Sequence, residues 1–330
     1  MTLEVIDNLA RLGEIRDQWW SIAQTITGLT PFQIPEWLIT WWSHFGTGGR
    51  LHVLVFREEN TMVGIIPCFR HQWNGRRQIT LLGSGISDYL EPAIQPQYSS
   101  AILDRLRSHL ETDSDWDICN WQDLYSDTPL RRLESNRTWE VLIGEDTECS
   151  EIPLTGSFGA FWEARPKHLR QNLRRDKKRA EIAGGLQFET AKTAEPEFTN
   201  GLLQLHAARW QRRGEPGVIA ASGSAEFLRD IVFEFARLGI LEFFSLRFRG
   251  KIAAIILSFV YANTIFFYLS GFDPEQEAMG FGRILLFEAL RHSHEKKYNS
   301  WNFLRGNEAY KYYWGAQRIP KCRLIVTRTS

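Results

Sequence analysis

The stretch Tyr268-Leu-Ser-Gly-Phe-Asp-Pro-Glu-Gln-Glu-Ala-Met-Gly-Phe-Gly-Arg-Ile-Leu-Leu286 decides how the second half of this 330-residue chain folds. An aromatic and aliphatic run ends before Gly271, a loop with Gly280 and Gly282 follows, and an amphipathic pattern begins at Arg283. A helix start presents unpaired N–H groups and a positive dipole end, and glycines let that backbone approach an anion closely. The stretch predicts a strand, an anion-binding loop and a helix, although the glycines could instead only shape a tight connection.

The segments on either side complete a regular order of elements. Three runs rich in aromatic and aliphatic residues precede the loop, and apolar spacing predicts a helix over Gly282–Lys297. The order predicts an antiparallel meander that continues through a right-handed crossover to a further strand. The expected strands are Leu241–Phe248, Ile252–Val260, Ile265–Ser270, Asn299–Leu304 and Lys321–Thr327.

The first half repeats this order more weakly. Its expected elements are the strands Leu51–Arg57, Val63–His71 and Gln78–Leu82, the helix Tyr98–Leu110 and the strand Trp116–Leu124. Two α/β (α+β) units in tandem, each a mixed, mostly antiparallel sheet with flanking helices, are the simplest account. Two unrelated domains are the alternative. Gly, Pro and acidic residues interrupt the periodicity near Gly144–Pro153, so we expect the units to span 1–150 and 151–330.

The net charge is zero, but the charges are unevenly distributed. Residues 1–150 carry 12 Arg, no Lys and 21 Asp or Glu, whereas residues 151–330 carry 27 basic and 18 acidic side chains. A polyanionic ligand would therefore be drawn to the second half. The ordinary hydrophobic content of 43% and charged content of 24% exclude collagen-like and disordered classes.

The segment Arg165–Glu181 holds eight basic and two acidic residues. Arg170, Arg174 and Lys178 recur every four residues and would share one helix face. This face is either simply solvated or a ridge that binds phosphates or nucleic acid. No helix-turn-helix, zinc-finger or RNP motif accompanies it, so we do not expect sequence-specific nucleic-acid recognition.

A second concentration of reactive side chains follows the strand after the predicted helix. Glu308 could accept a proton from an amine, while Tyr310 or Lys311 could stabilise a leaving thiolate or a developing oxyanion. Tyr268 is a further candidate. The alternative is an aromatic packing motif whose polar tips reach solvent.

Three features bear on the cellular compartment. The N-terminal residues lack a basic region followed by an apolar run, so we expect no secretory signal. The apolar stretch Ile252–Phe272 is interrupted by Tyr261–Thr264, so we expect no membrane span and a cytoplasmic location. The cysteines show no CxxC pair and no histidine at ligand spacing, which predicts reduced thiols and no metal site. They are Cys68, Cys119, Cys149 and Cys322.

The glycine loop that opens a helix, and the following strand that ends in the Gly-Asn-Glu-Ala-Tyr-Lys-Tyr-Tyr-Trp run of Gly306–Trp314, resemble the GNAT acyltransferase superfamily. Within it the chain resembles cellulose-biosynthesis-associated acetyltransferases, which are related to FemAB-type peptidoglycan aminoacyl transferases. Three segments of the first half look like the amino-terminal copy of that branch, so the resemblance spans nearly the whole chain. They are Pro31–Trp37, Val63–Pro67 and Ser87–Tyr89.

The superfamily's acyl-CoA signature is Gln/Arg-x-x-Gly-x-Gly/Ala. Gly280 and Gly282 match it, but Glu277 stands where the family has a basic or amide residue. This departure puts acetyl-CoA itself in question, because the related aminoacyl transferases use charged tRNA. The first half has no glycine-opened helix, so the resemblance implies a degenerate supporting copy there.

The resemblance implies transfer of an acyl group, acetyl or longer, from acyl-CoA as co-substrate to an amine, by direct attack and without a metal. The acceptor would be an unidentified amine such as an amino sugar or a cell-envelope precursor. The alternatives are aminoacyl transfer from charged tRNA and a non-catalytic role in polysaccharide assembly. The implied donor-binding residues are Ser270, Gly271, Gly280, Phe281, Gly282 and Arg283. The implied catalytic residues are Glu308, Tyr310, Lys311 and Tyr268.

Overall fold

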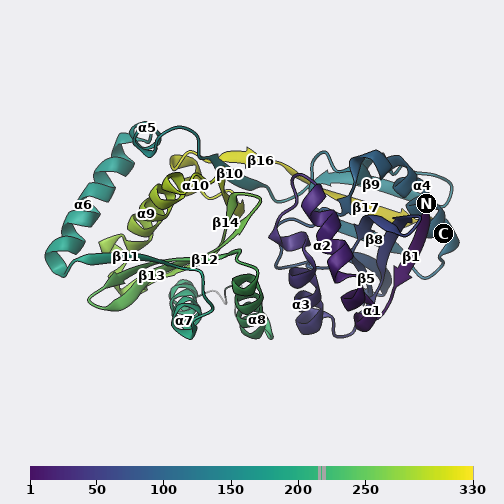
Figure 1. Cartoon of the computed structure of the whole chain (residues 1–330), viewed down its shortest axis with the longest axis horizontal. Coiled ribbons are helices and arrows are strands. Elements are labelled where there is room, and N and C mark those ends of the chain that lie inside the picture. Colours follow the sequence, from purple (N-terminus) through teal and green to yellow (C-terminus); the bar gives the residue numbers. More distant parts are fainter. Residues whose placement is uncertain (215–216, 218–220, 330) are drawn as a thin grey trace. The chain divides into compact units, whose positions relative to one another are not determined.

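The computed structural model describes residues 1–214, 217 and 221–329 and divides into two compact units (Figure 1). The first unit comprises Met1–Thr147 and Pro320–Ser330, and the second comprises Glu148–Ile319. The predicted division assigned everything after residue 150 to the second unit. The structure differs at the C-terminus, where the chain returns to the first unit.

The returning segment is β17 (Lys321–Arg328), which pairs antiparallel with both β8 (Ile118–Tyr125) and β9 (Trp139–Glu145). Its alternating residues Cys322 and Val326 are buried in the core of the first unit. A strand flanked on both edges and buried on one face is strongly specified by that core. The sequence pattern predicted the strand itself, but a strand pattern does not identify its partners.

The second unit is built on a seven-stranded sheet in the order β11-β12-β13-β14-β15-β10-β16. All neighbouring strands run antiparallel except β14 and β15, so the predicted meander leading to a parallel strand is confirmed. The strand bounds are β10 Cys149–Pro153, β11 Leu186–Ala191, β12 Leu241–Phe248, β13 Lys251–Tyr261, β14 Thr264–Phe272, β15 Ser300–Arg305 and β16 Gln317–Ile319.

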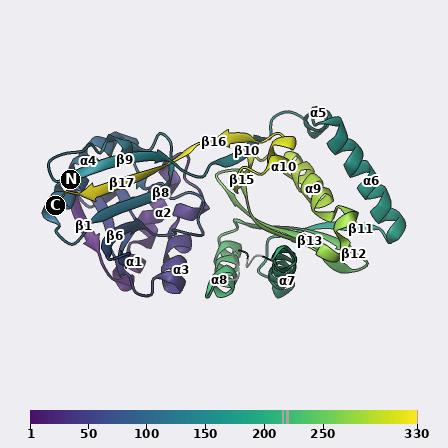
Figure 2. The ribbon, with the colours of Figure 1, turned by 180° about the vertical axis from the view of Figure 1, so that it is seen from behind.

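Helices cover both faces of this sheet. Figures 1 and 2 show α7 and α8 on one face, and α6 and α9 on the other. The predicted helix after the glycine loop is α9, whose apolar side packs into the core of the second unit. The helices are α5 Phe158–Glu163, α6 Lys167–Ala183, α7 Pro196–Arg213, α8 Ser224–Arg237, η5 Pro274–Met279, α9 Phe281–Glu295 and α10 Ala309–Tyr313.

The parallel pair β14–β15 is short and then diverges. Backbone pairing joins only Thr264–Phe266 of β14 to Ser300–Asn302 of β15. Beyond that point β14 continues to Phe272 along β13, and β15 continues to Arg305 along β10. The two strands therefore leave a wedge between them, with polar backbone groups facing it.

The first unit contains two sheets, β1-β3-β4-β7 and β2-β5-β6-β8-β17-β9. The predicted strand Val63–His71 is broken at Pro67, which has no N–H to donate, so β4 and β5 join different sheets. After β6 the chain forms α4 and returns as β8, which is parallel to β6. The remaining bounds are β1 Thr2–Ile6, β2 Arg50–Leu51, β3 Val53–Glu58, β4 Thr61–Ile66, β5 Cys68–Trp73, β6 Arg76–Leu81, β7 Ala93–Ile94, α1 Leu9–Glu14, α2 Arg16–Thr25, α3 Pro35–Phe45 and α4 Ser99–Thr112.

These elements confirm the predicted fold class of mixed sheets, mostly antiparallel, with flanking helices. The four cysteines are buried and unpaired, as expected. Across the described part of the chain, no helix is both long and apolar enough to span a bilayer.

Candidate functional site

A cleft of about 490 Å³ lies in the second unit, where β14 and β15 diverge. Its walls come from β14, the start of α9, the first turns of α6, and α10. The structure thus brings together two segments that are separated by the whole of α9 and β15. Seven of the predicted site residues line the cleft, namely Ser270, Gly271, Gly280, Phe281, Gly282, Arg283 and Tyr310.

Gly271 lets α7 lie directly against β14. A Cβ atom at this position would lie 2.7 Å from Leu205 Cβ and 2.8 Å from the His206 backbone nitrogen. The next contact along this line joins His206 Nδ1 to the Ser270 carbonyl oxygen at 3.2 Å. The glycine is therefore needed for the packing of α7, while its backbone also borders the cleft.

Gly280 joins η5 to α9 in a left-handed conformation, with φ of +70°. A side chain here would be strained by that φ and would also overlap the Asp176 carboxylate. Immediately after it, the amide groups of Phe281 and Gly282 donate to no acceptor among the described residues. Both residues line the cleft, so two free N–H groups at a helix N-terminus are available to an anionic ligand there.

Arg283 does not project as a free charge. Its guanidinium forms an ion pair with Asp176, whose side chain is only 5% exposed. Asp176 belongs to the buried stripe of α6, together with Leu173 and Ala180. The sequence predicted that Arg283 would strengthen an anion site. In the structure the arginine is instead paired with an internal carboxylate beside Gly280.

Tyr310 is the predicted catalytic residue that reaches the cleft. Its ring stands edge-on to Phe303, with centroids 6.0 Å apart. Although 41% of the residue is exposed, desolvation of the hydroxyl raises the pKa of Tyr310 well above its ordinary value, and the nearby Glu308 carboxylate adds to this. The phenol is therefore protonated at physiological pH, so it can act as a proton donor.

Lys311 lies outside the cleft lining and is buried. Its ammonium donates to the carbonyl oxygens of Arg305 at 2.7 Å and Gly306 at 3.1 Å. Glu308 Oε2 lies 3.0 Å from the same ammonium, on a side chain that is 57% exposed. These contacts stabilise the turn after β15. They give Lys311 a structural position rather than the predicted place beside a leaving group.

Tyr268 lies on the other face of the sheet. Its ring centroid is 5.2 Å from that of Phe259, which in turn contacts Phe235 of α8. The register between β13 and β14 shifts at this position, and it is the neighbouring Phe267 that lines the cleft. The structure therefore does not bring the Tyr268 side chain to the predicted site.

Several lining residues were not predicted, and three of them carry polar side chains from α6 and α7. Arg209 of α7 places its guanidinium 4.7 Å from the Phe272 ring centroid. His168 and Asn172 reach the cleft from α6. Their spacing of four residues on the basic helix could have indicated a shared face, but no sequence pattern indicated Arg209.

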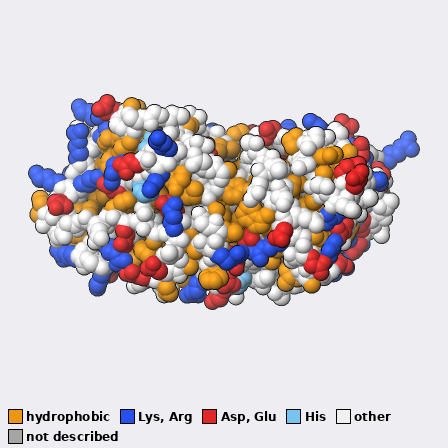
Figure 3. All heavy atoms as spheres, viewed as in Figure 1, with side chains coloured by type: hydrophobic (Ala, Val, Ile, Leu, Met, Phe, Trp, Pro, Cys, Tyr) orange, Lys and Arg blue, Asp and Glu red, His pale blue; other side chains and the backbone are white. Residues whose placement is uncertain are grey.

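The predicted basic helix is α6, and the side of it away from the core is charged. Arg174 and Lys178 are exposed, and Arg170 is partly exposed. Figure 3 shows Lys and Arg side chains gathered over this helix. The ridge predicted from the spacing is therefore accessible to a ligand.

Comparisons with known proteins agree with this arrangement. Residues 167–312 match the family described as acetyltransferase (GNAT) domain. No curated protein matches the chain. This stretch of the second unit is thus similar to GNAT acetyltransferase domains, which supports the prediction of an acyltransferase.

Solved structures share the fold over nearly the whole chain. FemX superposes with a TM-score of 0.68 at 9% identity, covering 98% of this chain and 97% of that one. The C-terminal domain of a putative lysylphosphatidylglycerol synthetase from Agrobacterium fabrum gives 0.60 at 13% identity, with 95% and 92% covered. A tandem GNAT protein from the clavulanic acid biosynthesis pathway gives 0.51 at 11% identity, with 99% and 98% covered. At these identities the likeness shows a shared fold.

Proposed function

We propose that the chain is an N-acyltransferase that moves an acyl group from acyl-CoA to an amine, with the donor in the cleft of the second unit. One observation carries the proposal. The wedge between β14 and β15 opens into a cleft that ends at the free N–H groups of Phe281 and Gly282. Unpaired strand edges suit the amides of a pantetheine arm, and a helix N-terminus suits a pyrophosphate.

The reaction needs no covalent enzyme intermediate. The amine attacks the thioester carbonyl carbon, a C–N bond forms, and the C–S bond breaks as the tetrahedral intermediate collapses. The amine loses one proton to water, and the departing thiolate gains one from the Tyr310 hydroxyl. The tyrosinate formed in this step then regains a proton from solvent, which restores the hydroxyl for the next turnover.

This assignment of roles departs from the sequence-based one. Glu308, Lys311 and Tyr268 do not line the cleft, so we propose no contact between them and the reacting atoms. We propose Arg209 as the basic side chain near the donor, because it lines the cleft from α7.

Aminoacyl transfer from charged tRNA is the second candidate. Asp176 and Glu277 place carboxylates close to the proposed phosphate position, which is unfavourable for a CoA pyrophosphate. The exposed ridge of α6 suits an RNA backbone, and FemX has the same fold. In this case the leaving group is a ribose hydroxyl, which Tyr310 would protonate in the same way.

Calorimetric titration with acetyl-CoA separates the two candidates. We expect binding by the wild type and at least a tenfold loss in Gly282→Val, because the new side chain stands at the free N–H groups. Gly159→Val in α5 is the matched control, since Gly159 is an exposed helical glycine with open space around it. Absence of acetyl-CoA binding, with salt-dependent tRNA binding weakened in an Arg170→Ala/Arg174→Ala variant, would favour aminoacyl transfer.

Substitution of Tyr310 tests the chemical step. Tyr310→Phe is expected to lower the turnover number on the order of 10²-fold or more, while leaving the donor dissociation constant within twofold. Tyr313→Phe is the control because Tyr313 also lines the cleft from α10. Thiol release with a panel of amino sugars and amino acids gives the readout. Equal turnover in both variants would remove Tyr310 from the mechanism.

Four parts of the prediction remain proposals, of which the cytoplasmic location rests on sequence patterns and the other three rest on the resemblance. They are the cellulose-biosynthesis-associated branch, an amino-sugar or cell-envelope acceptor, the cytoplasmic location, and the first unit as a degenerate supporting copy. The last is consistent with the parallel return of β8 beside β6 after α4, which repeats the order of β14, α9 and β15.

A further inference from the structure

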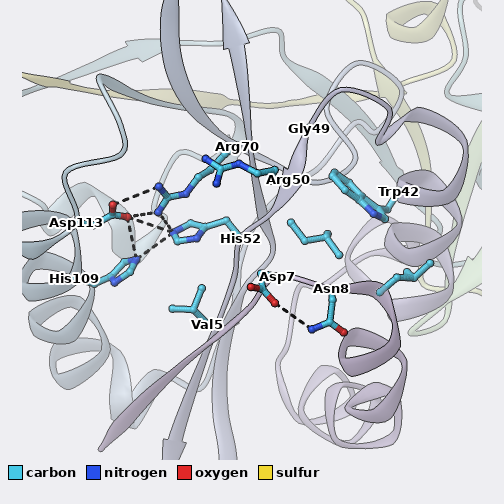
Figure 4. A pocket seen from close by; sticks show the side chains of 12 residues that line it. Val5, Asp7, Asn8, Trp42, Gly49, Arg50, His52, Arg70, His109 and Asp113 are labelled. Carbon is cyan, nitrogen blue, oxygen red and sulfur yellow. Dashed lines mark hydrogen bonds and ion pairs between the residues drawn. The ribbon is translucent and has the colours of Figure 1, made fainter.

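The first unit has its own cleft, of about 560 Å³, which the proposed acyl transfer does not use. Its lining combines Val5, Asp7 and Trp42 with a polar cluster at one end (Figure 4). We define the HHD cluster as His52, His109 and Asp113. His52 lies between β2 and β3, His109 is in the last turn of α4, and Asp113 is the residue that ends α4.

The HHD cluster turns three ligand atoms toward one point, as Figure 4 shows. His52 Nε2 lies 3.1 Å from His109 Nε2 and 3.9 Å from Asp113 Oδ2. His109 Nε2 lies 3.7 Å from the same oxygen. In the plane of the three atoms, the equidistant point lies about 2.1 Å from each, so a tetrahedral zinc ion above that plane requires the atoms to move closer by a few tenths of an ångström.

We infer that the HHD cluster is a zinc site, formed by two imidazoles and one carboxylate. The three separations average about 3.6 Å, close to the spacing of about 3.4 Å between ligands of a tetrahedral zinc ion. The three residues line the cleft, and water or an anionic ligand would complete the tetrahedron. The site lies in the first unit, so it is independent of the acyl-transfer proposal.

The surroundings prepare His52 to bind a metal. The Arg70 guanidinium can only donate hydrogen bonds, and its Nη2 lies 3.1 Å from His52 Nε2. His52 Nε2 therefore carries a lone pair, which is the form that ligates zinc. The imidazole is almost fully buried.

Asp113 is oriented by groups that are not ligands. Its Oδ1 accepts hydrogen bonds from the Asp115 amide at 2.9 Å and from Arg70 Nη1 at 3.3 Å. Such second contacts hold a ligating carboxylate in place and tune its affinity. The other oxygen, Oδ2, is the one that faces both histidines.

Arg70 also competes with the metal, because its Nη2 donates to Asp113 Oδ2. When zinc binds, Nη2 withdraws both from this oxygen and from His52 Nε2, whose single lone pair cannot accept a hydrogen bond and ligate zinc at once. Nη1 meanwhile stays anchored to Asp115, 2.8 Å from the carbonyl oxygen and 3.0 Å from the carboxylate. Removal of Arg70 is therefore expected to strengthen zinc binding.

No motif in the sequence indicated this site. His52 and His109 are 57 residues apart, and neither belongs to a recognised metal motif. The local signal is the pair His109 and Asp113, four residues apart at the end of one helix. The prediction of no metal site was based on spacing in the sequence alone. Spacing does not reveal His52, because only the fold brings it from another element to this pair.

The test is calorimetric titration of the full chain, without an affinity tag, with ZnCl₂. We expect one zinc per chain, and at least a tenfold loss of affinity in both His109→Ala and Asp113→Asn. His71→Ala is the matched control, because His71 follows Arg70 in β5 but bonds Thr80 instead of the HHD cluster. Its affinity should match that of the wild type.

Two further measurements keep the test decisive. Arg70→Gln should bind zinc several-fold more tightly, which does not depend on whether His109→Ala folds. X-ray absorption should show only nitrogen and oxygen neighbours near 2.0–2.1 Å, since binding by the cysteines would show sulfur near 2.3 Å. Absence of zinc binding, sulfur ligation, or equal affinity in the wild type, His109→Ala and Asp113→Asn would each overturn the inference.

Discussion

Gly271→Ala should destabilise the second unit, because the new methyl group would overlap atoms of α7. Its Cβ would meet Leu205 Cβ at 2.7 Å, the His206 backbone nitrogen at 2.8 Å and the Leu205 carbonyl carbon at 3.0 Å. Non-bonded carbon atoms prefer about 3.5–4.0 Å, so α7 has to move away from β14 by close to an ångström. Two of the three contacts are backbone atoms, which cannot swing aside.

Overpacking of this kind lowers the free energy of unfolding by about 1–3 kcal/mol. The loss of glycine flexibility in the unfolded chain offsets about 0.4–1 kcal/mol of that. We therefore expect a net loss of about 1–2 kcal/mol. Donor affinity should fall as well, because α7 also carries Arg209 into the cleft.

Gly282→Ala is the matched control with the opposite expected sign. Gly282 lies in the first turn of α9, and an added Cβ would meet the Phe272 ring at 3.4 Å, an ordinary contact. Alanine in a helix is more favourable than glycine by up to about 1 kcal/mol, so stability should be equal or higher. Acetyl-CoA binding should nevertheless weaken, because the methyl group borders the free amides.

Differential scanning calorimetry of the three proteins measures the stability difference, and hydrogen exchange of the α7 amides locates it. Surface substitutions ordinarily change the unfolding free energy by up to about 0.5 kcal/mol. If the unfolding free energy of Gly271→Ala lies within about that range of the wild type, the packing argument is refuted. Unchanged exchange in α7 with lowered stability would refute its location.

Lys311→Met should lower the unfolding free energy by about 2–4 kcal/mol in urea titrations, because it leaves buried carbonyl groups without a donor. Glu308→Gln changes an exposed side chain and should lower the unfolding free energy by less than about 1 kcal/mol. Burial raises the pKa of Glu91 to about 7, so protonation of Glu91 stabilises the fold in full below about pH 4.5. This stabilisation, up to about 3 kcal/mol, is lost as the pH rises through 7. Glu91→Gln should abolish that part of the pH dependence of the unfolding free energy. Asp176→Asn releases Arg283 and removes a negative charge beside Gly280, so acetyl-CoA should bind about fivefold more tightly by calorimetry, and unchanged affinity would place the phosphates elsewhere.

The second unit could be predicted well because its signals are local. The meander Leu241–Phe272 has alternating strands and short turns, and the glycine loop precedes a clear helical period. The first unit was harder, since Pro67 divides one apolar run between two sheets. β17 shows a further limit, because its apolar alternation is compatible with the core of either unit.

The candidate site could be predicted only for residues whose role depends on the backbone near them. Gly280 and Gly282 are recognisable because a positive φ and a helix start have a sequence signature. The role of Lys311 depends on backbone carbonyl groups in the turn after β15, which accept hydrogen bonds from its ammonium. The amino-acid sequence does not show that this turn places the carbonyl groups near Lys311. Arg209 reaches the cleft from a helix more than 50 residues before the loop, so only the tertiary fold places it there.

The pairing of Arg283 with Asp176 has the widest consequence for the choice of donor. In the sequence, the arginine at a helix start indicates one anion-binding site, and the basic helix before it indicates a second. The fold joins these two features through one buried carboxylate, so the positive charge of Arg283 is neutralised within the protein. Besides Arg283, the cleft presents the amides of Phe281 and Gly282 and the side chain of Arg209, and the ridge of α6 is exposed. A small pyrophosphate can use only the first two of these, whereas a long polyanion can use all three. The relative affinities for acetyl-CoA and tRNA therefore measure how strongly the Arg283–Asp176 ion pair favours one class of donor over the other.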